Sequence, residues 1–383
     1  RVGFHFASDN SDVGSGWYID DVGIEEGTLE FPTPEDFEDG FGDFTVTSGL
    51  WEVGTPSFGP ATAHSGENCV GTLLSGSYPN YGNSRLMTPP VALSAAPQDG
   101  QIWLRFWHAS DMSGGDSADR GIVQVSRDGG AWEDVPNSTV LYNGGNVWGQ
   151  AVYDLSAYAG STIQVAFHFA SDNADVGSGW YIDDVGIEEG ALEFPAPEDF
   201  ENGFGDFTVT SGLWEVGSPS FGPATAHSGE NCVGTILSGN YPDYGTSRLI
   251  TPPVALSAAP QDGQIWLRFW HASDMAGGDG GDYGIVQVAC DGAAWEDVPY
   301  STVLYNGGNV WGQALYDLSG YAGCTVQVAF HFVSDNAAMG SGWYIDDVSI
   351  EEGVLTVSNP EDFDSGEPHP PWHWWANAPN WSV

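Results

Sequence analysis

The chain repeats itself with a period of 163 residues, and this repeat constrains its fold more than any other feature. The phrase GSGWYIDDV stands at residues 14–22, 177–185 and 340–348, and Trp51 and Trp214 keep the same offset. The period therefore runs through a whole unit and is not confined to one short motif. A unit of this length can bury a hydrophobic core of its own. We expect each copy to form one domain.

Ending each copy at the phrase IEEG divides the chain into four parts. Residues 29–191 and 192–354 are two complete copies, residues 1–28 match the end of a copy, and residues 355–383 resemble the start of another, since PEDFDSG…NWSV echoes PEDFEDG…LWEV. The pattern predicts a segment of a longer array. The stretch GIEEGALEFPA at 186–196 is too short and too apolar for a flexible linker, so successive domains should hold a fixed orientation.

The hydrophobic pattern within a copy is that of β-strands. Apolar residues alternate with polar ones at 101–109, 121–126 and 161–170, and clusters of Gly, Pro, Asn and Asp separate these stretches. No segment shows sustained helical periodicity. With 53 Gly and 23 Pro, short strands joined by turns are expected. The sequence predicts an all-β fold of tandem antiparallel β-sandwich (jelly-roll) domains.

The chain is strongly acidic. It has 53 acidic residues against seven arginines and no lysine, which gives a formal net charge of −46. Such a charge repels nucleic acid and anionic membranes and attracts cations, and no apolar run is long enough to insert into a membrane. The excess of acidic residues has two possible explanations. One is solubility, including adaptation to brine, and the other is cation binding. The 41% hydrophobic and 13% aromatic content excludes a disordered acidic tail.

Two adjacent aspartates lie inside the last predicted strand of each copy. Strict alternation divides this strand into two faces: Tyr181, Asp183, Val185 and Ile187 on one, and Trp180, Ile182 and Asp184 on the other. One carboxylate must then point inward, which is unfavourable unless a cation, dense hydrogen bonding or a proton compensates its charge.

The available cationic side chains are few. Only Arg85 and Arg105, with their counterparts Arg248 and Arg268, occur in both copies. A hard metal ion is therefore a candidate partner for the inward aspartate, and ligation by oxygen atoms alone selects calcium. The alternative is an aspartate at a strand end that backbone N–H groups cap or water hydrates.

Three stretches of the repeat carry a family resemblance. The segments DFEDGFGDF…LWEV, WLRFWHASD…GIVQVSRDGGAWEDV and DLSAYAGSTIQVAFHFASD…GSGWYIDDV resemble MAM-like jelly-roll domains. These domains accompany secreted metallopeptidases of the immune-inhibitor-A type and the cleaved adhesin regions of surface proteases. The frame is also similar to that of jelly-roll carbohydrate-binding modules, in which a Glu near the first strand and an Asp in the last strand hold a structural calcium.

This resemblance implies a set of calcium ligands. The implied pairs are Glu38 with Asp183 and Glu201 with Asp346, the neighbours Asp184 and Asp347 are further candidates, and Asp20 and Asp364 would be half-sites. Asp364 stands where the complete copies have Glu, which shortens that ligand.

A second acidic cluster lies in the loop SDMSGGDSAD. Its members and their counterparts are Asp111, Asp116, Asp119, Asp274, Asp279 and Asp282. The spacing is not that of an EF-hand. The loop could hold a second calcium ion or be a solvated turn.

No catalytic motif accompanies the histidines. His64, His108 and His168 occur once in each copy, without HExxH, GxSxG or a Cys/His pairing. In the family that the chain resembles, peptidase activity resides in a separate domain. We expect structural histidines and a protein that is not an enzyme.

Tryptophan and arginine form a stripe on one predicted strand face. The stripe consists of Trp103, Arg105 and Trp107 in the first copy and of Trp266, Arg268 and Trp270 in the second. An exposed stripe suits sugar stacking, and it suits equally a contact with the next subunit. A third possibility is that neighbouring loops cover it.

Cysteines differ between the copies. Cys69 recurs as Cys232, as expected for a small buried residue, whereas Cys290 and Cys324 replace Arg127 and Ser161 of the first copy. Because Cys290 and Cys324 lie at the ends of predicted neighbouring strands, we predict a disulfide between them, worth roughly 2–4 kcal/mol. It would indicate an extracellular setting. The alternative is two independent thiols.

Two triplets match the N-glycosylation pattern. They begin at Asn137 and Asn380, although the second copy has Tyr300 in place of Asn137. The match is weak in a chain this rich in Asn, Ser and Thr.

Two function classes are compatible with these features. The favoured hypothesis is a non-catalytic extracellular or cell-surface protein, structural or adhesive and stabilised by calcium, whose copies contact each other head to tail in a stalk, sheath or filament. The alternative is a set of carbohydrate-binding accessory modules of a secreted hydrolase or peptidase.

Overall fold

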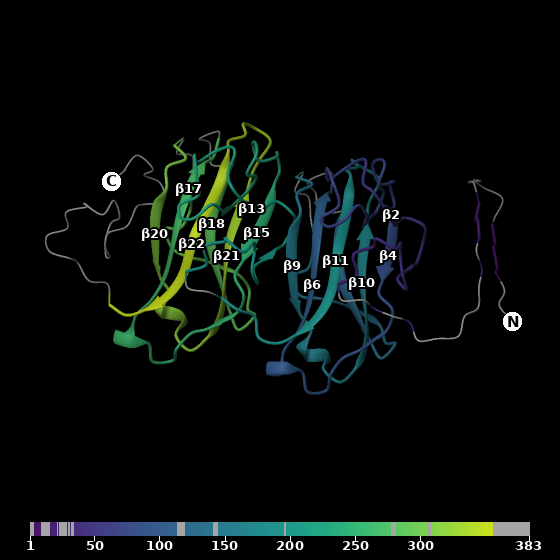
Figure 1. Ribbon diagram of the computed structural model, residues 1–383, viewed down its shortest axis with the longest axis horizontal. Helices are drawn as coiled ribbons and strands as arrows, with labels where there is room; N and C mark the ends of the chain where they lie inside the picture. Colours follow the sequence, from purple (N-terminus) through teal and green to yellow (C-terminus); the bar gives the residue numbers. More distant parts are fainter. Residues whose placement is uncertain are drawn as a thin grey trace.

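The two complete copies form two β-sandwiches (Figure 1). The computed structural model describes residues 4–8, 16–20, 22, 29, 31, 34–112, 119–140, 145–194, 197–276, 281–304 and 308–354. Within these ranges the regular elements are β-strands and four short 3-10 helices, and no α-helix occurs. This confirms the predicted all-β class.

The first sandwich pairs a six-stranded sheet with a five-stranded sheet. The six-stranded sheet has the order β1 (Thr45–Val46), β4 (Asn83–Met87), β10 (Thr162–Ala170), β7 (Arg120–Arg127) and β8 (Trp132–Asp134), with β5 (Val91–Ala92) on β10. The five-stranded sheet has the order β2 (Glu52–Gly54), β3 (Cys69–Gly71), β11 (Gly179–Glu189), β6 (Ile102–Asp111) and β9 (Gly149–Asp154). The short helices η1 (Gln98–Gly100) and η2 (Ser156–Tyr158) lie between strands.

The second sandwich repeats this topology. Its six-stranded sheet has the order β12 (Thr208–Val209), β15 (Thr246–Ile250), β21 (Thr325–Val333), β18 (Tyr283–Cys290) and β19 (Glu296–Asp297), with β16 (Val254–Ala255) on β21. Its five-stranded sheet has the order β13 (Glu215–Gly217), β14 (Cys232–Gly234), β22 (Gly342–Glu352), β17 (Ile265–Asp274) and β20 (Gly312–Asp317). The helices η3 (Gln261–Gly263) and η4 (Ser319–Tyr321) match η1 and η2. All the strand pairings are antiparallel.

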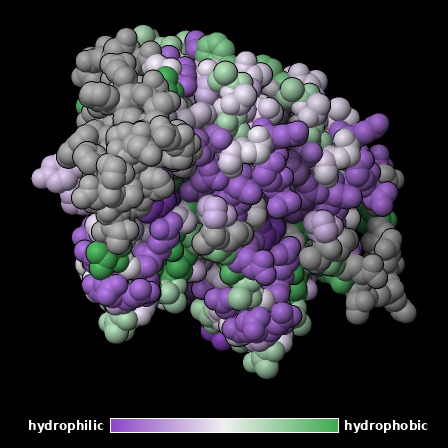
Figure 2. All heavy atoms as spheres, turned by 60° about the vertical axis from the view of Figure 1, so that its left-hand side comes forward, coloured by the Kyte–Doolittle hydropathy of each residue, from purple (hydrophilic) through white to green (hydrophobic). Residues whose placement is uncertain are grey.

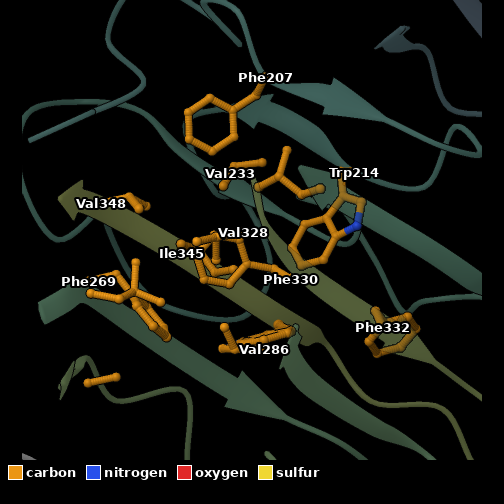
Figure 3. Close-up of a cluster of buried hydrophobic side chains, with 14 of the residues drawn as sticks. Phe207, Trp214, Val233, Phe269, Val286, Val328, Phe330, Phe332, Ile345 and Val348 are labelled. Atoms are coloured by element: carbon orange, nitrogen blue, oxygen red, sulfur yellow. The ribbon is translucent and has the colours of Figure 1, made fainter. Parts of the chain in front are cut away.

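Each core lies between the two sheets, where the apolar residues of the alternating strands meet. In β6, Ile102, Leu104 and Phe106 are fully buried. Figure 3 shows the equivalent core of the second sandwich, with Phe269 and Phe330 from facing sheets beside Val328 and Ile345. Alternation on the outer faces leaves polar side chains at the surface, and hydrophilic residues predominate on the face in Figure 2.

The alternation of side chains between the two faces of β11 breaks at Asp184. The prediction of which residues share a face of this strand is therefore corrected. Asp183 pairs with Trp107 of β6, but Gly186 pairs with Arg105, so β11 carries one extra residue there. Asp184 has a positive φ of 49°, as expected of a residue in a β-bulge. Val185 therefore packs in the core with Trp180 and Ile182, and Ile187 packs against it. Their predicted position beside Asp183 is wrong because strict alternation allows for no bulge.

The predicted disulfide is confirmed. Cys290 and Cys324 are bonded, with their Cα atoms 5.6 Å apart. They lie near the ends of β18 and β21, where Cys290 is opposite Val326. Cys69 and Cys232 are free and buried, as expected for small apolar residues.

Candidate functional site

The adjacent aspartates hold one loop, residues 64–68, against the five-stranded sheet. Oδ2 of Asp183 accepts hydrogen bonds from the backbone N–H groups of His64 (3.0 Å) and Ser65 (3.2 Å). Asp184 accepts one from the Ser65 hydroxyl at 2.8 Å, and its Oδ2 lies 2.6 Å from Nδ1 of His64. Because of the bulge, both carboxylates serve the same side of the sheet.

Glu38 holds the other end of the same loop. Its Oε1 accepts the backbone N–H groups of Glu67 (2.8 Å) and Asn68 (2.7 Å). Residues Glu38 and Asp183, which the resemblance paired as calcium ligands, therefore meet at one loop. Backbone N–H groups cap both carboxylates, as in the alternative considered for the inward aspartate.

The pKa values of the two aspartates are shifted in opposite directions. Burial raises the pKa of Asp183 to about 7, and the neighbouring charge of Asp184 adds to the rise, although hydrogen bonds from the loop oppose it. Burial would raise the pKa of Asp184 as well, but the hydrogen bonds from His64 and Ser65 outweigh it, so that pKa is lowered. As pH rises, Asp184 therefore loses its proton before Asp183 does.

The second copy repeats this cluster. Asp346 accepts the N–H groups of His227 and Ser228, and Asp347 lies 2.5 Å from Nδ1 of His227. His227, Asp346 and Asp347 bring one nitrogen and two carboxylate ligands within reach of one another. Calcium prefers six to eight oxygen ligands, and these three residues do not supply that set. Calcium binding at Glu38 and Asp183, and at Glu201 and Asp346, remains a prediction.

The histidine, serine and aspartate of this cluster are not arranged as a catalytic triad. In a triad the histidine stands between the carboxylate and the hydroxyl that it activates. Here Asp184 accepts from both Ser65 and His64, and the ring of His64 stacks on Trp107 with centroids 3.7 Å apart. The arrangement fixes the loop and does not activate the serine.

The second acidic cluster is only partly described. Asp119 accepts a hydrogen bond from Tyr78 at 2.6 Å and another from the backbone of Asp172, which makes it a buried structural group. Burial raises the pKa of Asp111. Asp282 repeats the bonds of Asp119, and Asp274 ends β17. Asp116 and Asp279 lie outside the described residues.

Of the remaining candidates for metal binding and glycosylation, Asp20 and Asn137 are among the described residues. Asp20 and Asn137 are exposed, and Asn137 lies at the junction of the two sandwiches. Asp364 and Asn380 lie outside the described residues. Glycosylation and the half-sites stay predictions.

The Trp-Arg-Trp stripe is covered in the first copy. Trp103 is 5% exposed, and its indole N–H donates to the carbonyl of Gly190 at 2.8 Å. Trp107 lies between His64 and Phe204 of the second sandwich. The stripe is therefore not an open platform for sugar stacking, and both a loop and the next domain contact it.

Arg105 joins the two sandwiches. Its Nη2 donates to Asp206 of the second sandwich at 2.6 Å, and its Nε donates to Glu188 of its own sheet at 3.2 Å. His108 is fully buried, with Nε2 3.0 Å from the carbonyl oxygen of Val209. Gln150 donates to the carbonyls of residues 205 and 207. Figure 1 shows β9, which carries Gln150, at the edge that faces the second sandwich.

The sequence did not single out a polar face on the six-stranded sheet. Arg85 lies over the ring of Trp132, 5.8 Å from its centroid, and donates from Nε to Gln124 at 2.8 Å. Gln124 in turn donates to Asp134 at 2.7 Å. These four residues, which we call the first Arg–Trp face, lie opposite the core. Recurrence at the 163-residue offset was the signal that could have found them.

The second copy carries the same face beside a pocket. Arg248 lies 5.9 Å from the ring of Trp295 and donates to Gln287, which donates to Asp297. These residues form the second Arg–Trp face. A pocket of about 310 Å³ adjoins it and spans both sandwiches. Its lining residues are Asn137, Thr139, Thr210, Ser211, Thr246, Ser247, Arg248 and Trp295.

Comparison with known proteins gives one related sequence. The chain matches no family model. Over 161 residues it is 40% identical to Bacillopeptidase F of Bacillus subtilis (strain 168), a match that covers 40% of this chain and 10% of that protein. The matched part of the chain spans about a tenth of the length of this relative. No comparison confirms the resemblance to MAM-like domains.

Similar solved structures include carbohydrate-binding modules. The tandem CBM22-1–CBM22-2 domain of Paenibacillus barcinonensis Xyn10C has 14% identity and a TM-score of 0.29, over 84% of this chain and 97% of that one. TmCBM61, solved with β-1,4-galactotriose, has 18% identity and a TM-score of 0.31, over 42% and 97%. At these values the likeness carries no argument about function.

No helix in the described part of the chain is both long and apolar enough to cross a membrane.

Proposed function

We propose that the two sandwiches are non-catalytic accessory domains of a secreted hydrolase and that their Arg–Trp faces bind carbohydrate. The recurrence of the same tryptophan, guanidinium, amide and carboxylate on the outer sheet face of both copies carries this proposal. The sequence identity with a peptidase over about one repeat supports an accessory place in a larger enzyme. The Cys290–Cys324 disulfide supports an extracellular location.

The chemistry of the faces suits a sugar. An aromatic ring offers an apolar surface to the C–H groups of a pyranose, while the guanidinium donates and the carboxylate accepts hydrogen bonds from hydroxyl groups. The chain already fixes the Arg85 side chain through Gln124, so little side-chain freedom is lost on binding. The net charge of −46 disfavours anionic polysaccharides. A neutral polysaccharide is therefore the proposed ligand class.

Calorimetric titration of the full chain with neutral glucan, galactan, xylan and mannan tests the proposal. We expect one of these to bind and the double variant Trp132→Ala/Trp295→Ala to weaken binding about tenfold or more, equivalent to about 1.4 kcal/mol. Phe58 and Phe221 supply a matched control, since they are 45% and 43% exposed aromatic residues at the same offset. The variant Phe58→Ala/Phe221→Ala should bind as wild type does. Equal losses in both variants, or binding to none of the four, would refute the proposal.

A further inference from the structure

A groove lies between the two sandwiches, beside the second Arg–Trp face. It consists of the pocket that adjoins this face and of a larger pocket of about 610 Å³, and Asn137 and Trp295 line both. We call the two pockets together the junction groove. The volume is within the range of roughly 300–1,000 Å³ typical of small-molecule sites, which often form between domains. Aromatic and polar side chains from both sandwiches line the larger pocket, among them Trp103, Tyr153, Asp154, Tyr158, Thr208 and Asp291.

Contacts between the sandwiches fix the walls of the groove. The hydroxyl of Thr208 donates to the carbonyl of Val152 at 3.2 Å, and both residues line the larger pocket. Arg105 and Asp206 add an ion pair of 2.6 Å between the same two sandwiches. The walls are therefore in place before a ligand binds. A site that is already ordered loses less conformational entropy on binding than one that the ligand must order.

Two buried hydroxyl groups of residues that line the groove have no hydrogen-bond partner among the described residues. They belong to Tyr153 in the larger pocket and to Ser247 in the smaller one. These two residues are only 6% and 2% exposed. In the first copy the counterpart of Ser247 is bonded, since Ser84 donates to the carbonyl of Ser48 at 2.7 Å. Because buried hydroxyl groups are usually bonded, the unbonded pair indicates a ligand that supplies hydrogen-bond partners.

The charges along the groove favour a neutral ligand. Among the described residues, the larger pocket has two carboxylates, Asp154 and Asp291, and no positively charged side chain, whereas the smaller pocket has Arg248. The backbone N–H groups of Ser156 and Thr325 donate to one oxygen of each carboxylate, at 2.7 and 2.9 Å, and so orient both. An anion would be repelled by the carboxylates and a cation by the arginine. Hydroxyl groups can donate to the carboxylates and accept from the guanidinium.

We propose that the junction groove is one site for a neutral oligosaccharide, which binds at Trp295 and extends across the junction to Asp154. This inference rests on the proposed function, because Trp295 belongs to the second Arg–Trp face. The partly buried rings of Tyr158 and Trp295 offer apolar surface to the C–H groups of the sugar. The amide of Asn137 and the carboxylate of Asp154 form hydrogen bonds with its hydroxyl groups. A single sugar chain thereby contacts both sandwiches.

The two Arg–Trp faces therefore differ in affinity. Neither Arg85 nor Trp132 of the first face lines the junction groove. A sugar at the first face lacks the contacts that the groove adds at the second. We expect longer oligosaccharides to bind more tightly than short ones, and to occupy one strong site in the full chain. Trp295→Ala should weaken binding of the longest oligosaccharide more than Trp132→Ala does.

Calorimetric titration of the full chain with dimers to hexamers of glucose, galactose, xylose and mannose tests this site. The variant Tyr153→Phe/Asp154→Ala should weaken binding of the hexamer about tenfold or more, equivalent to about 1.4 kcal/mol. The matched control Tyr316→Phe/Asp317→Ala makes the same changes at the 163-residue offset, where neither residue lines the groove. Both variants lose the same backbone contact, since Asp154 and Asp317 each accept an N–H group, at 2.7 and 2.8 Å. The control should bind as wild type does.

Protection of β10 amides from hydrogen exchange reports whether the first sandwich stays folded. If the double variant loses this protection, the single variant Tyr153→Phe, which removes only the unbonded hydroxyl, decides in its place. Wild-type affinity in a folded groove variant would overturn the junction site and leave the proposed function standing. Equal losses in the groove variant and its control would also overturn the junction site. Binding of no neutral sugar at all would refute the proposed function, and the junction site with it.

Discussion

The two sandwiches have the same sheet topology. They differ in the bond that joins the ends of two neighbouring strands. In the first, Nε of Arg127 donates to the hydroxyl of Ser161 at 2.8 Å, near the ends of β7 and β10. In the second, the same two positions are Cys290 and Cys324 and form a disulfide. The strand register is the same in both copies. The topology thus does not depend on the covalent bond, since a hydrogen bond joins the same two positions in the first copy.

The largest expected difference between the sandwiches concerns acid. Burial lowers the pKa of His271 and His331 in the second sandwich to about 4, but only that of His108 in the first falls as far. In the unfolded chain each of these histidines binds a proton near pH 6.5, whereas in the folded chain it does so only near pH 4. The free energy of unfolding is therefore highest above pH 6.5 and decreases as pH falls toward 4. Each histidine contributes roughly 3 kcal/mol. The second sandwich should be the more sensitive to acid.

Asp183 and Asp346 act in the opposite direction and equally in both sandwiches. Their pKa is raised to about 7 by burial, so their contribution is complete below about pH 4 and is lost as pH rises through 7. Because each sandwich contains one such aspartate, these contributions do not change the difference in acid sensitivity between the two sandwiches. Hydrogen-exchange rates of the backbone amides, corrected for the intrinsic effect of pH, measure the stability of each sandwich: β11 reports on the first and β22 on the second. His331→Gln should make the two acid profiles alike, whereas an unchanged profile would contradict the assignment.

The disulfide should give the next largest effect. Cys290→Ser/Cys324→Ser should lower the free energy of unfolding of the second sandwich by about 2–4 kcal/mol, because the unfolded chain regains the entropy of a closed loop. The reciprocal variant Arg127→Cys/Ser161→Cys should stabilise the first sandwich by a similar amount under oxidising conditions. Urea denaturation with and without reductant measures both. An introduced bond that forms without raising the denaturation midpoint would show that the two positions are not equivalent.

Much of the fold could be predicted because strand alternation and the repeat report on it directly. Ile102, Leu104 and Phe106 follow a period of two and are all buried. The disulfide could be inferred because Cys290 and Cys324 entered one copy together. The fold class follows from the local strand patterns, and the disulfide follows from a difference between the copies.

The site could not be predicted as well, for two physical reasons. The bulge at Asp184 needs a positive φ that the residue type alone does not reveal. Partners such as Arg105 and Asp206 are 101 positions apart and meet only because the domains pack. The polar residues of the Arg–Trp faces converge from three strands, and alternation says only that each points outward.

Calcium binding should act alike on both sandwiches, so of the three effects it should change the difference between them least. If calcium binds at Glu38 and Asp183, saturation at a hundredfold above Kd adds about 2.7 kcal/mol to the folded state. Calcium and protons would compete for Asp183, so a chelator should lower the melting temperature more at pH 8 than at pH 5. Asp183→Asn should abolish the chelator effect in the first sandwich and leave it in the second. Identical melting curves in chelator and in excess calcium at pH 8 would mean that the capping N–H groups alone stabilise Asp183.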